Sequence, residues 1–146
     1  MRRTRIPIAL IDDDRLWAET LAEFLDEKGF AAHCAEGGVR GLALLEKTPF
    51  SVAVVDLHMP DMDGLELVRQ VRRRRIPVEV ILISNDDDPF LAQRLTQEEG
   101  LPFLSKSAVP RLLVQTVEQA LKARERSAAE ARARAPWNRL LTGPAG

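Results

Sequence analysis

Polar residues that could act together on a phosphoryl group or a metal ion follow the apolar runs of this chain. Asp12 and Asp13 come directly after IPIALI, and Asp56 ends SVAVVD. Ser84 ends VEVILIS, and Lys106 ends FLSK. Because an ionised carboxylate is costly to bury without a positive partner, Asp56 needs either a cation beside it or a chemical role.

These residue types support the metal-assisted transfer of a phosphoryl group to a carboxylate. Three carboxylates brought together repel one another and raise the pKa of at least one, unless a cation binds them. Hard oxygen ligands with positions left for water suit Mg²⁺, with Mn²⁺ as a substitute. A metal ion and Lys106 would neutralise incoming phosphoryl oxygens, so that Asp56 could attack in line and form an acyl phosphate.

The elements that must position these residues alternate along the chain. Short apolar runs predict strands over 6–12, 30–35, 51–56, 78–84 and 103–106. Amphipathic segments between them predict helices over 15–28, 39–47, 64–75, 89–99 and 109–126. In the first helix, Leu16, Thr20, Leu21, Phe24 and Leu25 are expected to share the buried face, and Asp14 is expected to cap its start. Alternation of this kind predicts a parallel sheet with helices on both faces.

Length and composition limit the class of protein. A chain of 146 residues with 45% apolar residues is about one domain. The net charge of −1 argues against a nucleic-acid surface spread over the domain. The single cysteine, Cys34, cannot form an internal disulfide and is interpreted as a small buried residue in a reducing compartment. Apolar runs are too short for a membrane span or a signal peptide, so we expect a cytoplasmic protein without membrane contact.

Four motifs, in this order and spacing, resemble the receiver domain of response regulators in bacterial two-component signalling, of the chemotaxis-regulator type. They are DDD, VVDLHMPDMDG with its P-x-x-D-G loop, ILIS and FLSK, and the resemblance covers residues 6 to 124. The resemblance implies a flavodoxin-like five-stranded sheet in the order 2-1-3-4-5. In such a sheet the ligand site lies outside the carboxyl ends of the strands, where the acids are placed.

The resemblance also implies a role for each matching residue. Asp56 corresponds to the phosphoacceptor, Asp12 and Asp13 to the acidic pair that holds Mg²⁺, and the His58 backbone carbonyl to a further metal ligand. Ser84 and Lys106 correspond to the groups that contact the phosphoryl oxygens. Ser84 and Phe103 occupy the switch positions, whereas His58, Asn85 and Asp86 lie where side chains tune access or phosphoryl lifetime.

The chain departs from the family pattern at two places beside this site. Ser107 follows Lys106 where the family usually has a proline in a cis peptide. Either the site tolerates the strain of a non-proline cis bond, or the peptide is trans, in which case we expect Lys106 to be displaced. Asn85 replaces a small residue and is expected to narrow the mouth of the site.

The function implied is a switch that accepts a phosphoryl group on Asp56 from a histidine kinase or a phosphotransfer protein. The surface of the fourth helix, fifth strand and fifth helix would then bind a downstream effector or a second copy of the chain. Such a protein catalyses only its own phosphorylation and dephosphorylation. A degenerate receiver that binds partners without phosphorylation is the alternative. An aspartyl phosphatase is disfavoured because it needs an acid two residues after the nucleophile, where His58 stands.

The chain is expected to comprise a receiver domain over 1–126 and a linker or tail over 127–146. The sequence becomes Ala/Arg-rich after about Arg126, and the run from Pro110 to about Ala135 could form one long helix, or its end could be a frayed tail. The receiver either stands alone or forms the front of a longer regulator.

Overall fold

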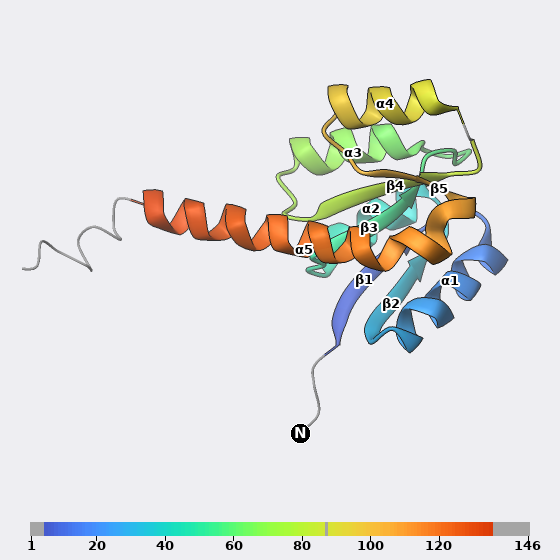
Figure 1. Cartoon of the computed structure of the whole chain (residues 1–146), viewed down its shortest axis with the longest axis horizontal. Coiled ribbons are helices and arrows are strands. Elements are labelled where there is room, and N and C mark those ends of the chain that lie inside the picture. The colour runs from blue at the N-terminus through green and yellow to red at the C-terminus, as the bar shows by residue number, and fades with distance from the viewer. Residues whose placement is uncertain (1–4, 87, 136–146) are drawn as a thin grey trace, which may run out of the picture.

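Five parallel strands and five helices alternate in the computed structural model, which describes residues 5–86 and 88–135. The elements are β1 (Ile6–Ile11), α1 (Arg15–Glu27), β2 (Phe30–Ala35), α2 (Gly38–Lys47), β3 (Val52–Asp56), α3 (Gly64–Arg73), β4 (Glu79–Ser84), α4 (Pro89–Glu98), β5 (Phe103–Ser105) and α5 (Val109–Arg134), with a 3₁₀ turn (Lys106–Ala108) before α5. The strand order is β2-β1-β3-β4-β5, which confirms the expected fold (Figure 1).

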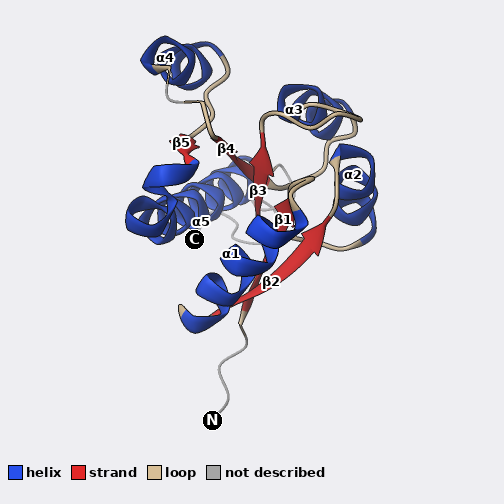
Figure 2. Ribbon diagram, turned by 90° about the vertical axis from the view of Figure 1, so that its right-hand side faces the viewer, coloured by secondary structure: helices blue, strands red, loops and turns tan. Residues whose placement is uncertain are grey.

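Both faces of the sheet are covered, and alternate strand residues serve the two sides. In β1, Ile8 and Leu10 pack toward α1 and α5, whereas Ala9 and Ile11 pack toward α2, α3 and α4 (Figure 2). The central strands β3 and β4 repeat this division. Burial on both faces explains why these strands are almost continuously apolar.

Helix α1 begins as predicted, and its buried face agrees with the prediction only in part. The Asp14 carboxylate accepts a hydrogen bond from the Trp17 backbone N–H at 3.1 Å, and so caps the helix. Leu21 and Leu25 are buried, but Leu16 is 75% exposed and Thr20 is exposed as well, so the assignment of these two residues to the buried face was wrong. Leu16 lies five residues before Leu21, which rotates its side chain by about 140° away from the buried stripe.

Asp61, in the loop after β3, caps a helix that cannot cap itself. The residue before α2 is Gly37, which has no side chain to accept hydrogen bonds. The Asp61 carboxylate instead accepts from the backbone N–H groups of Gly38 and Val39, each at 3.0 Å. These two bonds lower the pKa of Asp61 below its ordinary value. They also tie the loop that follows Asp56 to the start of α2.

We predict that Asp61→Ala lowers the free energy of unfolding by about 1 kcal/mol near neutral pH, as expected for a lost cap. Because the folded pKa is depressed, this stability is present above the ordinary pKa of 3.8 and is lost as the pH falls through the folded value. Urea unfolding at neutral and acid pH measures the effect. Asp61→Asn, which retains an acceptor, is the control, and equal stability of the Ala variant and wild type at neutral pH would contradict the assignment.

Helix α5 continues past the boundary expected at Arg126. Val109, Leu113 and Val117 are buried against the sheet, whereas residues 125–134 are exposed along a helix that extends beyond the sheet (Figure 1). The long-helix alternative is therefore confirmed as far as Arg134. None of the helices in the described residues offers the apolar stretch that a membrane crossing requires.

Candidate functional site

Three carboxylates converge at the carboxyl edge of the sheet. Strands β1 and β3 pair with Ile11 beside Val55, so the next residues, Asp12 and Asp56, lie side by side. Asp12, Asp13 and Asp56 each offer an oxygen, and these oxygens lie within 4.8 Å of one another. Asp12 and Asp56 are 2% and 6% exposed, whereas Asp13 faces solvent. The cluster thus has a buried base and an open side.

Lys106 lies within the acid cluster. Its Nζ is 2.9 Å from Asp12 Oδ2 and 3.5 Å from Asp56 Oδ2, and the side chain is buried. No peptide bond among the described residues is cis, so the expectation that a trans peptide before Ser107 would displace Lys106 was wrong. The chain turns at once into the 3₁₀ turn, with Ser105 Oγ and Ser107 Oγ hydrogen-bonded at 2.9 Å. This turn keeps Lys106 at the sheet edge, and its flexible stem reaches the acids.

Burial and mutual repulsion perturb the titration of these groups. Burial, followed by the negative charge of Asp12, raises the pKa of Asp56 to about 6, although Lys106 and the His58 backbone N–H oppose the shift. Burial by itself would lower the pKa of Lys106, but Asp12 and Asp56 raise it above its ordinary value. The ammonium therefore stays charged at neutral pH, while Asp56 is held in a costly ionised state.

We predict that the metal-free protein loses stability as the pH rises from about 4 to about 7. The pKa of Asp56 is 3.8 in its unperturbed state and about 6 in the folded chain, so the folded state binds more protons between these values. This stabilisation is fully present below pH 3.8 and is lost as the pH rises through about 6. The loss lowers the free energy of unfolding by an amount on the order of 2 kcal/mol. Chemical unfolding in chelator across this range measures the loss.

Asp56→Asn is the control for this pH dependence. The variant should be more stable than wild type near neutral pH and should lack most of the fall, because the amide does not ionise. A parallel fall in both proteins would assign the pH dependence to other groups.

The residues present fit a bound divalent cation. Three carboxylates and one ammonium leave a formal charge of −3 + 1 = −2. Asp12 Oδ2 is buried, and among the described residues it has no hydrogen-bond partner, since its contact with Lys106 is an ion pair without hydrogen-bond geometry. A buried acceptor without a donor, next to two further carboxylates, is suited to a hard cation such as Mg²⁺.

Ser84 lies one step beyond Asp56 on the neighbouring strand. Asp56 pairs with Ile83 in the register of β3 and β4, and Ser84 follows, completely buried. Its Oγ accepts a hydrogen bond from the Asp86 backbone N–H at 3.0 Å. The hydroxyl thus anchors the start of the loop that leads to α4.

The remaining predicted residues surround this site without entering the acid cluster. The side chains of His58, Asn85 and Asp86 are exposed, at the loops where β3 and β4 end. Phe103 is half-buried and packs against the core on the α2–α4 side of the sheet. Their positions agree with the places expected for them, and their tuning and switch roles stay predictions.

Trp17 belongs to the site but was not predicted to do so. Lys106 Nζ lies 4.5 Å from the centroid of the Trp17 ring, over its face. The signal available in the sequence was an aromatic residue in the first turn after the capping Asp14. Because Leu16 was placed on the buried face, its neighbour Trp17 was not considered.

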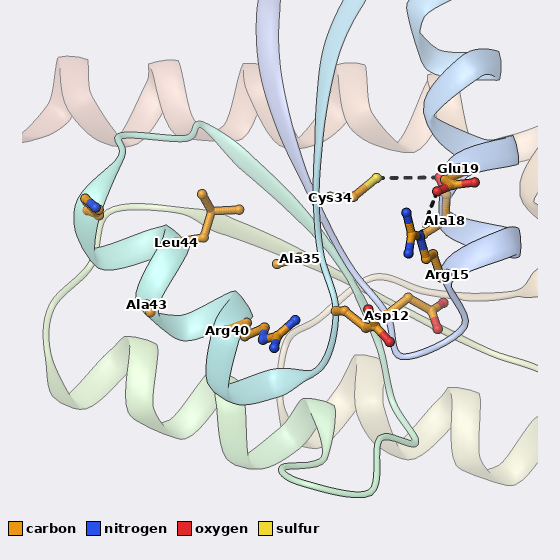
Figure 3. Close-up of a pocket in the computed structure, with 11 residues that line it drawn as sticks. Asp12, Arg15, Ala18, Glu19, Cys34, Ala35, Arg40, Ala43 and Leu44 are labelled. Carbon is orange, nitrogen blue, oxygen red and sulfur yellow. Dashed lines mark hydrogen bonds and ion pairs between the residues drawn. The ribbon is translucent and has the colours of Figure 1, made fainter.

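A hollow lies beside the acid cluster, not over it. It has a volume of about 540 Å³ between α1 and α2, and among the three acids only Asp12 lines it (Figure 3). Cys34 lines the other side of this hollow and is exposed, because β2 is an edge strand. The expectation of a buried cysteine was therefore wrong. Partial burial of the sulfur, with Glu19 and Asp26 nearby, raises the pKa of the Cys34 thiol, which does not favour a reactive thiolate.

Comparisons with known proteins agree with this geometry. The family model of the response regulator receiver domain matches residues 8–118. Response regulator receiver protein Anae109_2439 of Anaeromyxobacter is 40% identical over 107 residues, which are 71% of this chain and 44% of that protein. Transcriptional regulatory protein TctD of Salmonella typhimurium is 36% identical over 77 residues, which are 53% of this chain and 34% of that protein.

The solved receiver domain of Francisella response regulator 1452 has a TM-score of 0.74 and 25% identity, covering 82% of this chain and 98% of that one. This chain spans less than half the length of the two curated relatives named above.

Proposed function

This chain belongs to the response regulator receiver domain family, and from that premise we propose that it is a signalling switch phosphorylated on Asp56. The observation that carries the proposal is the position of Lys106, whose ammonium lies between Asp12 and Asp56 in a buried acid cluster. A purely structural ion pair would need one acid rather than three. The third carboxylate and the open side point to a site built for a cation and an incoming group.

In the proposed reaction, a carboxylate oxygen of Asp56 attacks phosphorus. The new oxygen–phosphorus bond forms as the bond between phosphorus and the donor breaks, and the donor leaves with that electron pair. Lys106 supplies positive charge to the phosphoryl oxygens, and Asp12 holds Lys106 in place. Asp12, Asp13, Asp56 and the His58 carbonyl would hold Mg²⁺ or Mn²⁺. The bound ion would supply further charge neutralisation.

The same site offers a route from phosphorylation to a change of surface. The added phosphoryl group carries about −1.5 to −2 charge and three acceptor oxygens. These oxygens would accept a hydrogen bond from the Ser84 hydroxyl, and movement of the hydroxyl toward them would draw it away from the Asp86 N–H, which now donates to it and ties down the loop before α4. Phe103 lines a hollow of about 250 Å³ with Asp86, Asp88 and Pro89, so movement of this loop would alter the face formed by α4, β5 and α5.

The proposed partners follow from this arrangement. A histidine kinase or phosphotransfer protein would supply the phosphoryl group in the cytoplasm. Because TctD is named a transcriptional regulatory protein, an effector protein or domain is the proposed recipient of the signal, with a second copy of this chain as an alternative. The chain would catalyse only its own phosphorylation and dephosphorylation.

Intact-mass measurement after incubation with acetyl phosphate tests the proposal. With Mg²⁺ the chain should gain the mass of one phosphoryl group, and with excess chelator it should gain none. No gain with Mg²⁺ or Mn²⁺ would refute the proposal in favour of the degenerate receiver. Partner binding would then be expected without phosphorylation.

A further inference from the structure

We infer that Trp17 is a positioning residue for Lys106, whose ammonium it holds against the ring face while the acids react. The inference rests on the proposed phosphorylation of Asp56 and extends it to a residue outside the acid cluster. The Lys106 ammonium lies 4.5 Å from the ring centroid, within the range of a cation–π interaction, and the lysine side chain is 6% exposed. Exclusion of water strengthens such a contact.

The position of the ring is fixed by a closed series of contacts. Asp12 Oδ1 accepts a hydrogen bond from the Asp14 backbone N–H at 2.8 Å. Asp14 Oδ1 accepts from the Trp17 backbone N–H at 3.1 Å, and the Trp17 ring faces Lys106. Lys106 returns to Asp12 through its 2.9 Å ion pair. The capped end of α1 therefore carries the ring to the ammonium as a rigid unit.

Trp17 differs from the other contacts of Lys106 because it takes no part in the proposed chemistry. The Asp56 carboxylate becomes the acyl phosphate, and the Asp12 carboxylate would be shared with the cation. Both acids then hold the ammonium less strongly than they do in this structure. The ring face keeps its full attraction for the ammonium throughout, so the contact matters most when the reaction proceeds.

The ring also closes the apolar side of the lysine. Trp17, Phe24 and Val109 line a hollow of about 170 Å³ between α1 and the start of α5, and Lys106 forms part of its wall. Without the indole, the ammonium could turn toward solvent through this hollow. The indole therefore limits Lys106 to the direction of Asp56.

Rates of phosphorylation by acetyl phosphate with Mg²⁺ test the role of the ring face. All proteins carry Trp137→Phe, so that Trp17 is the single tryptophan. Trp17→Phe retains an aromatic face and should stay within about threefold of the parent, whereas Trp17→Met should react roughly 5- to 30-fold more slowly. Phe24→Leu, which alters the same hollow at a ring that faces Lys28, should react like the parent.

A double-mutant cycle separates positioning from a general loss of structure. In a Lys106→Met background, Trp17→Met should cause no further loss of rate, because the ammonium that the ring holds is absent. Equal rates for the Phe and Met variants, or an undiminished effect of Trp17→Met in the Lys106→Met background, would overturn the inference.

Tryptophan emission of the metal-free protein tests the contact without any phosphoryl transfer and with Trp17 intact. Lys106→Met should shift the emission of Trp17, because it removes a unit charge next to the indole. Lys28→Met is the control and should leave the emission unchanged. If no protein is phosphorylated, the proposed function fails, and this emission result decides the contact by itself. Unchanged emission in Lys106→Met would overturn the inferred contact between Trp17 and Lys106.

Discussion

Asp56→Asn should abolish the gain of phosphoryl mass from acetyl phosphate and Mg²⁺. The amide oxygen cannot replace the carboxylate as nucleophile. Asp12 and Asp13 remain in the variant as acids that would hold the cation, so the loss of the added mass would identify Asp56 as the acceptor among the three. Time courses of intact mass for wild type and variant, under identical donor and metal concentrations, measure the effect.

Asp63→Asn is the matched control for this variant. Asp63 lies in the same loop and caps α3 by accepting from the Glu66 backbone N–H at 2.8 Å. Because asparagine caps a helix about as well as aspartate, the control should fold and become phosphorylated normally. Phosphoryl mass that persists in Asp56→Asn would place the acceptor elsewhere.

Lys106→Met should slow phosphorylation by about two to three orders of magnitude, because it removes a preorganised positive charge that would stabilise the phosphoryl group during transfer. It should also lower the stability of the metal-free protein by about 3 kcal/mol or more, because Asp12 and Asp56 lose the cation that compensates them. Phosphorylation rates and chemical unfolding, each with and without Mg²⁺, measure both effects.

The two readouts should respond differently to metal. Mg²⁺ should restore much of the stability of Lys106→Met, because it binds the folded state and neutralises the same acids. Mg²⁺ should not restore the phosphorylation rate, because the Lys106 ammonium, which would contact the phosphoryl oxygens, stays absent. Lys122→Met, at an exposed position on α5, is the control. A variant that phosphorylates at the wild-type rate would remove Lys106 from the mechanism.

The sheet and its reactive edge could be predicted because both depend on short-range patterns. Apolar runs of strand length ended at Asp56, Ser84 and Lys106, and parallel strands bring their carboxyl ends to one edge. The order of the strands could not be obtained from these patterns and came from the family resemblance. The position of Lys106 was mispredicted because the flexible stem of a lysine uncouples its ammonium from the peptide that follows.

Two other features depend on contacts that no local pattern reveals. Asp61 caps a helix whose first residue lies 23 positions earlier in the chain. Adjacent apolar residues at the start of α1 left the helical phase ambiguous, so that Leu16 was assigned inward and Trp17 was overlooked. In both cases the partner became visible only when distant segments were folded together.

The exposed end of α5 would set the distance and direction of any group fused to it. The Arg124 side chain donates a hydrogen bond to the Pro77 carbonyl of the domain, and the helix continues ten residues further to Arg134. At 1.5 Å per residue, a group fused at Arg134 would be held about 15 Å beyond that contact. Each residue deleted between Arg124 and Arg134 would turn the fused group by about 100° around the helix axis and bring it about 1.5 Å closer, so a deletion of one residue would change mainly its direction, whereas a deletion of four would change mainly its distance.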